Sequence, residues 1–301
     1  MQATLATQDP TANASSIANV DALIDDVEEL LSLPDAAIRL NTLLTDPDAT
    51  TAQIAEVVSL DPALAARVLR AVNSAYFGLR SRVDTISKAI TMIGTSELHS
   101  LVLATSAAQA FKNISCKLID METFWQHSVR AALAARGFSE SCLSRHRERV
   151  FLAALMHDIG KLVLYHQLPA ESGRVLEAVN AGEVQEEVEL SVLGYTHADV
   201  GAALLERWNL PASLAVPVRY HHRYAEAPQF AKESALIYLG SEVAHLMEKD
   251  RTDEAPRLPD ADGAWTQAGC LPSELQEVMI DVDMHWLQVI EIVAPGSLLL
   301  Y

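Results

Sequence analysis

The sequence feature that most constrains the fold is a helical repeat of apolar residues. It is clearest after Asp61, a good helix N-cap, which is followed by Pro62 at a position that suits the first helical turn. Leu64, Val68 and Val72 then recur at every fourth position, which places them on one face of a helix. Most of the chain reads the same way, with short breakers and no convincing run of alternating apolar and polar residues. The sequence therefore predicts an all-α fold.

Two further segments carry clear helix boundaries. One follows Asp84 and is stopped by Gly94, and the other begins with a capping-box-like Thr196-x-x-Asp199 and is ended by Pro211. Their predicted core faces are Ile86, Ile90 and Ile93 in the first, and Val200, Leu204 and Trp208 in the second. At the end of the helix after Asp61, Asn73 and Ser74 are predicted to cap backbone groups of a neighbouring segment.

The helical rhythm is interrupted in a few places, which suggest how the chain is organised. Residues 169–187 are mixed and acidic, which indicates a short helix with loops, and the proline-rich, charged residues 248–272 indicate a long loop before a last helix at about 273–290. The predicted parts are a disordered lead-in (1–18), an N-terminal helical subdomain (19–114), a second helical subdomain (115–247), and an acidic loop with a C-terminal helix (248–301).

The charge balance limits which partners the surface can attract. The chain has 22 Lys and Arg against 40 Asp and Glu, a formal net charge of −18, and this acidity repels nucleic-acid backbones and anionic membrane surfaces. Three widely spaced cysteines without a CxxC motif suggest neither a disulfide framework nor a cysteine-based zinc site. With no signal peptide and no long apolar run, we expect a cytoplasmic protein that binds neither nucleic acid directly nor a membrane.

The adjacent pair His157 and Asp158 lies in the apolar segment FLAALMHDIGKLVL, which reads as a buried helix. Burying an imidazole and a carboxylate is costly unless each has a partner. A metal ion is one such partner, because both groups are good ligands. The alternative is that the two residues form a hydrogen bond with each other. The dipeptide alone supplies too few ligands to distinguish a metal site from such a pair.

Further histidines raise the weight of the metal interpretation. They occur in the order His127, His157 with Asp158, His197, then His221 with His222, each on or beside a predicted helix. Helical bundles can direct such side chains inward to one centre. The remaining histidines lack a comparable context and are assigned ordinary structural or surface roles: His99, His146, His166, His245 and His285.

This ordered set resembles the HD superfamily of metal-dependent phosphohydrolases, and within it the HDOD family of bacterial signalling proteins. Several motifs of that family occur in the right order over roughly residues 25–247. They are SLDPALAARVLRAVNSAYFG at 59–78, ISKAITMIG at 86–94, FWQHS at 124–128, LMHDIGKLVL at 155–164, E-x4-GYTHADVGAALLERWNLP from Glu189 to Pro211, and RYHH at 219–222. No receiver, GGDEF or helix-turn-helix segment is evident, which suggests a stand-alone HDOD protein.

The resemblance also implies a set of ligands for a divalent metal such as iron, manganese, magnesium or zinc. The HD ligands correspond to His127, His157 and Asp158, and the catalytic HD-GYP branch adds histidines that match His197, His221 and His222. The last aspartate of HD enzymes corresponds to Ser241, a poor ligand, and the Gly-Tyr-Pro element that follows the histidine pair in that branch is replaced here by HHRYAEAP.

Two functions from different classes follow from this resemblance. The departures from the enzyme pattern favour a non-catalytic regulator that acts through contacts with signalling proteins and keeps at most a vestigial metal site. The alternative is a metal-dependent phosphohydrolase, in which Lys161 stabilises developing phosphate charge. Lys161 is equally suited to pair with a buried acid such as Glu189. The partner, the input signal and the oligomeric state are not specified by the sequence.

Overall fold

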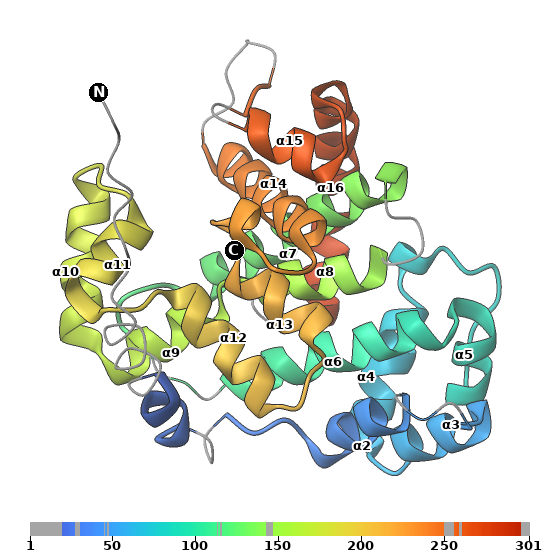
Figure 1. The fold of residues 1–301 in the computed structure, drawn as a ribbon. Helices are drawn as coiled ribbons and strands as arrows, with labels where there is room; N and C mark the ends of the chain where they lie inside the picture. Colours follow the sequence, from blue (N-terminus) through green and yellow to red (C-terminus); the bar gives the residue numbers. More distant parts are fainter. Residues whose placement is uncertain are drawn as a thin grey trace.

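Helices make up every regular element in the described part of the chain, as the sequence predicts (Figure 1). The computed structural model describes residues 20–27, 31–44, 46, 48–112, 114, 116–142, 147–249, 256–258 and 261–295. The predicted lead-in at 1–18 lies outside the described residues, as do His146 and part of the predicted loop at 248–272. In the described helices, none is long and apolar enough to cross a membrane.

The first part of the chain forms a layer of short helices at the lower right of Figure 1. Its elements are α2 (Asp35–Leu44), α3 (Thr51–Ser59), α4 (Pro62–Val72), the 3-10 turn η1 (Ala75–Phe77), α5 (Ile86–Ile93) and the longer α6 (Thr95–Phe111). Helix α3 packs on α2 and α5, and α6 contacts α2, α4 and α5. Helix α6 also contacts α8, so it connects this layer to the rest of the molecule.

The remaining helices surround the long helix α7. In chain order they are α7 (Met121–Cys142), α8 (Arg147–Leu155), α9 (Ile159–Gln167), α10 (Pro169–Asn180), α11 (Gln185–Leu193), α12 (His197–Arg207), α13 (Ala212–Arg219), η2 (Tyr224–Glu226), α14 (Ala231–Glu248), α15 (Asp262–Ala268), η3 (Pro272–Glu274) and α16 (Leu275–Val293). Helix α7 packs against α8, α14 and α16, while α12 packs against α9 and α13. Helix α16 returns to contact α4 and α6, so the C-terminal part also touches the first layer.

The predicted capping roles of Asp61, Thr196 and Asn73 are confirmed, whereas the Ser74 hydroxyl, also predicted to cap, makes no hydrogen bond within the described residues. The Asp61 carboxylate accepts hydrogen bonds from the amides of Ala63 (2.9 Å) and Leu64 (3.0 Å), and Thr196 and Asp199 form a full capping box. Asn73 also caps a neighbouring segment, because its side chain both donates to and accepts from the backbone of Val83.

Three sequence predictions need correction. Residues 169–187 are not a short helix with loops: they hold the twelve-residue α10 and the start of α11. The predicted loop at 248–272 contains the short helix α15. The apolar segment around His157 is not one helix, because residues 156–158 form a turn between α8 and α9. In each case local composition was a weaker guide than the packing of the segment in the fold.

Two glycines allow pairs of helices to approach closely beside the predicted site. A Cβ atom added to Gly160 of α9 would lie 2.0 Å from the backbone oxygen of His197 at the start of α12. A Cβ atom on Gly240 of α14 would lie 2.4 Å from the backbone oxygen of Ala131 in α7. Any larger residue at these positions would force the helix pairs apart, so the glycines set the distances between the helices that carry the histidines.

Candidate metal centre

The six predicted ligand residues come from separate elements and meet in one buried region. His127 is on α7, His157 and Asp158 form the turn before α9, and His197 begins α12. His221 and His222 follow α13. The side chains form two groups whose ligand atoms lie within 4.8 Å of one another: His127, His157 and Asp158, and His197, His221 and His222. The rings of His157 and His221 are 5.0 Å apart, which joins the two groups.

His157 and His221 are oriented in the same way by the backbone. The Nδ1 of His157 lies 2.7 Å from the Ala154 carbonyl, and that of His221 lies 2.7 Å from the Val218 carbonyl. A carbonyl only accepts, so Nδ1 carries the proton in both rings and Nε2 presents its lone pair to the centre. Burial lowers the pKa of His157 to about 3 and that of His221 well below its ordinary value, so both rings are neutral.

Asp158 lies between the two groups of histidines. Its Oδ2 is 2.7 Å from Lys161 Nζ and 3.4 Å from His157 Nε2, while its Oδ1 is 3.3 Å from His197 Nε2. Burial opposes ionisation of this carboxyl, but the neighbouring histidines and Lys161 outweigh it and hold the pKa of Asp158 well below its ordinary value. Asp158 is therefore a buried carboxylate whose charge is stabilised by the surrounding histidines and by Lys161.

His197 is held by Glu189, the carboxylate named above as a possible partner of Lys161. Its Nδ1 donates to Glu189, with distances of 2.9 and 2.7 Å to the two carboxylate oxygens, and its backbone amide donates to the same group at 2.8 Å. Burial disfavours the charged ring, but the Glu189 carboxylate prevails and raises the pKa of His197 to about 9. The buried acid that pairs with Lys161 is Asp158 and not Glu189, which was named as its possible partner, because Glu189 pairs with His197.

His127 is held by the last turn of α14. Its Nδ1 donates to Glu248 at 2.9 Å, and its Nε2 faces the hydroxyl of Ser241 at 3.4 Å and Asp158 at 3.9 Å. Ser241 therefore does sit beside the ligand set, at the position where the resemblance implies an aspartate. Sequence reasoning missed Glu248 and gave His245 an ordinary role, although both form a third group with His127. Their spacing of three residues on one helix was the available signal.

The donor set fits a divalent metal ion. Within the described residues, three buried polar atoms of this centre have no hydrogen-bond partner: Nε2 of His157, Nε2 of His221 and Oδ1 of Asp158. Buried polar atoms are rarely left unpaired, and neutral imidazole nitrogens and a carboxylate oxygen are suitable ligands for iron, zinc or manganese. His127 and His197 each donate their other ring nitrogen to a carboxylate, which is the usual support for a ligating histidine.

The centre is closed to solvent on most sides. His157, His197 and His221 have no exposed surface, and Asp158 is 4% exposed. His127 is also buried, and His222 is partly buried. The arrangement can thus bind and enclose an ion.

The HDOD domain family matches residues 30–224 of this sequence. The chain belongs to the HDOD family. The family resemblance inferred from the motifs is therefore confirmed, and the matched region contains all six predicted ligand residues.

Solved structures share the fold over almost the whole chain. A protein from Shewanella amazonensis SB2B, named a candidate phosphohydrolase, is 27% identical, with a TM-score of 0.74 over 91% of this chain and 98% of that chain. An HDOD domain protein of unknown function from Geobacter sulfurreducens is 22% identical, with a TM-score of 0.71 over 96% and 100% of the two chains, and shows the fold alone.

A curated relative from Treponema pallidum (strain Nichols), whose name assigns no function, is 24% identical over 240 residues. The match covers 78% of this chain and 46% of the relative, so the chain spans about half the length of the curated protein that it matches.

Proposed function

We propose that this HDOD protein is a regulatory module that acts through contacts with signalling proteins, and that its histidine centre holds a divalent metal ion for structural reasons. The observation that carries the proposal is the closure of the centre, in which the Asp158 carboxylate and three histidine rings are almost or fully buried. Catalysis on a phosphodiester needs substrate within reach of the ligands, and burial removes that access.

The residues around Asp158 also suit a structural role better than a catalytic one. Lys161, the only residue predicted to stabilise phosphate charge, donates to Asp158 at 2.7 Å and is mostly buried. A lysine used in this way compensates a buried carboxylate and is not oriented toward a substrate. Ser241 supplies a hydroxyl where HD enzymes, by resemblance, have a carboxylate ligand.

The second candidate, a metal-dependent phosphohydrolase, draws support from the nearly complete ligand set and from the name of the 27% identical Shewanella protein. The residues that would hold the ion are His127, His157, Asp158, His197, His221 and His222. A divalent ion in such a site supplies a Lewis acid that polarises a phosphoryl oxygen. In that case Glu189 and Glu248 would orient His197 and His127, and Lys161 would have to leave Asp158 to contact the phosphate.

The two candidates are separated by measuring metal content and hydrolysis on the same sample. Protein purified without chelators is expected to contain divalent metal by elemental analysis, and to leave bis-p-nitrophenyl phosphate and cyclic di-GMP intact with added Mn²⁺ or Fe²⁺. Turnover that disappears in Asp158→Ala would establish the phosphohydrolase and overturn our proposal.

The Ser241→Asp variant tests whether the centre is one ligand short of activity. The new carboxylate would lie beside His127 Nε2, which is 3.4 Å from the present hydroxyl. We expect metal retention to rise without the appearance of hydrolysis, because access remains closed. Hydrolysis gained by this variant would show that the missing ligand, and not burial, abolishes catalysis.

A further inference from the structure

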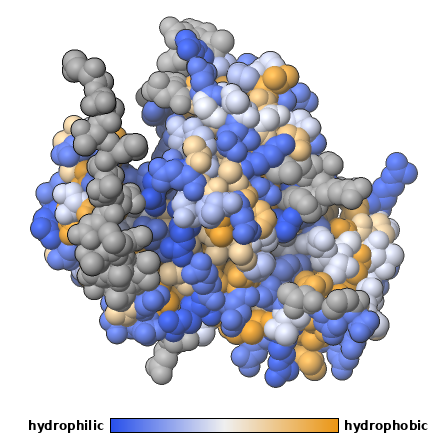
Figure 2. Space-filling model, in the orientation of Figure 1, coloured by the Kyte–Doolittle hydropathy of each residue, from blue (hydrophilic) through white to orange (hydrophobic). Residues whose placement is uncertain are grey.

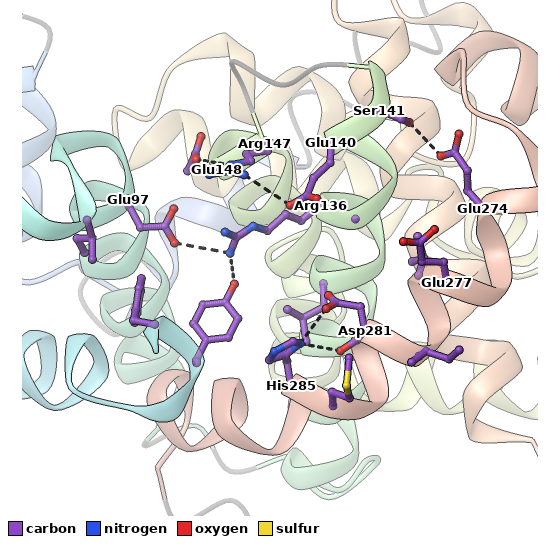
Figure 3. Close-up of a pocket in the computed structure, with 18 of the residues that line it drawn as sticks. Glu97, Arg136, Glu140, Ser141, Arg147, Glu148, Glu274, Glu277, Asp281 and His285 are labelled. Atoms are coloured by element: carbon purple, nitrogen blue, oxygen red, sulfur yellow. Dashed lines mark hydrogen bonds and ion pairs between the residues drawn. The ribbon is translucent and has the colours of Figure 1, made fainter. Parts of the chain in front are cut away.

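A large acidic cleft lies apart from the histidine centre, between the first helical layer and the C-terminal helix. It has a volume of about 1120 Å³. Residues of η1, α5 and α6 line it from the first layer, and residues of α7, α8, η3 and α16 line the rest of it (Figure 3). None of the six predicted metal ligands lines it. The proposed metal centre therefore leaves this cleft without a role.

Negative charge dominates the lining of the cleft. Six carboxylates face it, against two guanidinium groups: Glu97, Glu140, Glu148, Glu274, Glu277 and Asp281, with Arg136 and Arg147. Both arginines are already engaged, since Arg136 pairs with Glu97 at 3.6 Å and with the Tyr76 hydroxyl, and Arg147 pairs with Glu148 at 3.0 Å and Glu140 at 3.5 Å (Figure 3).

The α16 wall keeps most of the uncompensated charge. Asp281 contacts His285 at 3.0 Å and Glu274 accepts from Ser141 at 2.9 Å, but Glu277 has no ion pair within the described residues. A cation brought to this wall would therefore meet Glu274 and Glu277, for which the described residues provide no arginine or lysine ion-pair partner.

The same cleft exposes large apolar side chains. Met92 of α5 is 47% exposed, and Ile280 and Met284 of α16 are 51% and 59% exposed. Exposed apolar groups gathered within a recess mark interaction sites more often than scattered ones do. Methionine is unbranched and adapts its shape to different partners. An occupant of this cleft thus gains by presenting apolar side chains together with positive charge.

The chain itself and a second copy of it are poor occupants on grounds of charge. Residues 1–19 contain no lysine or arginine, and residues 296–301 carry no charged side chain. A second copy has the same net charge of −18 and would bring like charge to the cleft. Complementarity requires a different molecule with basic and apolar residues together.

We propose that this cleft docks a basic amphipathic helix of a partner protein. Such a helix presents apolar residues every three or four positions to a groove and basic residues on its flanks. Met92, Ile280 and Met284 would receive the apolar face, and Glu277 with its neighbours on α16 would receive the cations. The inference rests on the proposed regulatory function and names the surface and the partner chemistry through which that function operates.

The test uses a fluorescein-labelled synthetic peptide of about four helical turns, with leucines on one face and lysines on the other. Binding to the full chain is followed by fluorescence anisotropy at about 0.15 M salt, where exposed charges more than about 8 Å apart are largely screened. A peptide with glutamate in place of lysine is the ligand control and is expected not to bind.

Matched variants distinguish the cleft from the general acidity of the surface. Glu277→Lys and Ile280→Ser change the proposed site, whereas Glu183→Lys and Leu190→Ser make the same types of change at exposed positions outside it. We expect each cleft variant to weaken peptide binding by about tenfold and each control by less than about twofold.

Three results would overturn the inference: no peptide binding, equal weakening by cleft and control variants, or self-association of the protein that Ile280→Ser abolishes in sedimentation. The last would identify a second copy as the occupant. Hydrolysis in the phosphodiester assays would refute the proposed regulatory function but would leave the peptide measurement unchanged, so the two failures can be told apart.

Discussion

Asp158 illustrates how one residue governs the energetics of a buried polar centre. Its carboxylate contacts the partly buried Lys161 at 2.7 Å and faces the fully buried His197 at 3.3 Å. Burying a charge is costly unless a partner compensates it, and removing one member leaves the other uncompensated. The stability of this region therefore depends on the charge of Asp158 more than on its volume.

Asp158→Asn is expected to lower the free energy of unfolding by roughly 3–5 kcal/mol, because Lys161 loses its buried counter-charge. Urea denaturation monitored by circular dichroism gives the value. The matched control is Asp84→Asn, whose exposed pair with Lys88 should contribute less than about 1 kcal/mol. Equal effects of the two substitutions would show that Lys161 does not depend on Asp158.

His99 provides a pH dependence that is independent of the metal centre. Burial lowers its pKa from 6.5 to about 4, and within the described residues its buried Nε2 has no hydrogen-bond partner. Because the folded pKa is below the unfolded one, the unfolded chain binds the proton more tightly between these values. This group therefore destabilises the fold as the pH falls from 6.5 toward 4, and adds nothing further below that.

Replacing His99 by Gln is expected to reduce the loss of stability between pH 6.5 and pH 4, the range set by the two pKa values. The difference from the parent protein is at most about 3 kcal/mol, at roughly 1.4 kcal/mol per pKa unit. Urea titrations at a series of pH values measure it. The same substitution at His166, a partly buried histidine of α9, is the control.

At the scale of helices, two close approaches position the centre. Gly160 lets α9 meet the start of α12, which brings the turn with Asp158 to His197. Gly240 lets α14 meet α7, which brings Ser241 to His127. In both cases a backbone oxygen occupies the space that a Cβ atom would need. Rotation of a neighbouring side chain therefore cannot make room for a larger residue in either helix pair.

Gly160→Ala is therefore expected to destabilise the protein by more than about 2 kcal/mol, since overpacking against a backbone forces helices apart. Gly173→Ala, inside α10 with open space around it, should instead stabilise it by up to about 1 kcal/mol through helix propensity. Thermal unfolding of the two variants tests the contrast. A neutral Gly160→Ala would mean that α9 and α12 pack less closely than described.

The whole molecule combines a strongly acidic surface with helices that return to one another from distant parts of the chain. Hydrophilic residues cover much of the face in Figure 2, with hydrophobic residues interspersed, in keeping with a net charge of −18. Contacts of α16 with α4, α6 and α7 connect the two ends of the sequence. The predicted division into subdomains near residue 115 stays a prediction. The contacts of α16 join helices on both sides of that position, which neither confirms nor contradicts the division.

One long-range pair offers a measurable link across the molecule. The sulfur atoms of Cys142 and Cys270 lie 3.3 Å apart although 128 positions separate them, and their mutual hydrogen bond is the main cause that lowers the pKa of Cys142 to about 7. A thiolate at Cys142 can attack a peroxide, lose two electrons with the second thiol, and form a disulfide while the peroxide is reduced to water.

After the folded protein is treated with hydrogen peroxide and then unfolded, the number of titratable thiols is expected to fall from three to one, with Cys116 remaining free. Closing so long a loop should raise stability by up to about 4 kcal/mol through the entropy of the unfolded chain. Thiol titration and urea denaturation measure both effects, and Cys270→Ser should abolish them. Retention of three thiols would show that the pair does not form a bond.

The candidate site was predicted in part, for reasons that individual residues make clear. His127, His157, Asp158, His197, His221 and His222 could be named from their order and their resemblance to a known family, and the structure brings them together. Glu248 was missed as the partner of His127 because 121 positions separate the two residues, and the only local signal was its three-residue spacing from His245. The role of Lys161 was left open between contacting phosphate and pairing with a buried acid such as Glu189, and only the structure shows that its partner is Asp158.

The sequence alone determined the features that depend on near neighbours. Helix caps at Asp61 and Thr196 and the apolar repeat after Asp61 rely on residues within about four positions, where hydrogen bonds and burial can be read directly. Only the tertiary structure decided that α8 and α9 break at His157, that the histidine centre is closed, and that α5 and α16 form an acidic cleft. These depend on packing between distant segments, and the steric limit imposed by Gly160 and Gly240 appears only when those segments meet.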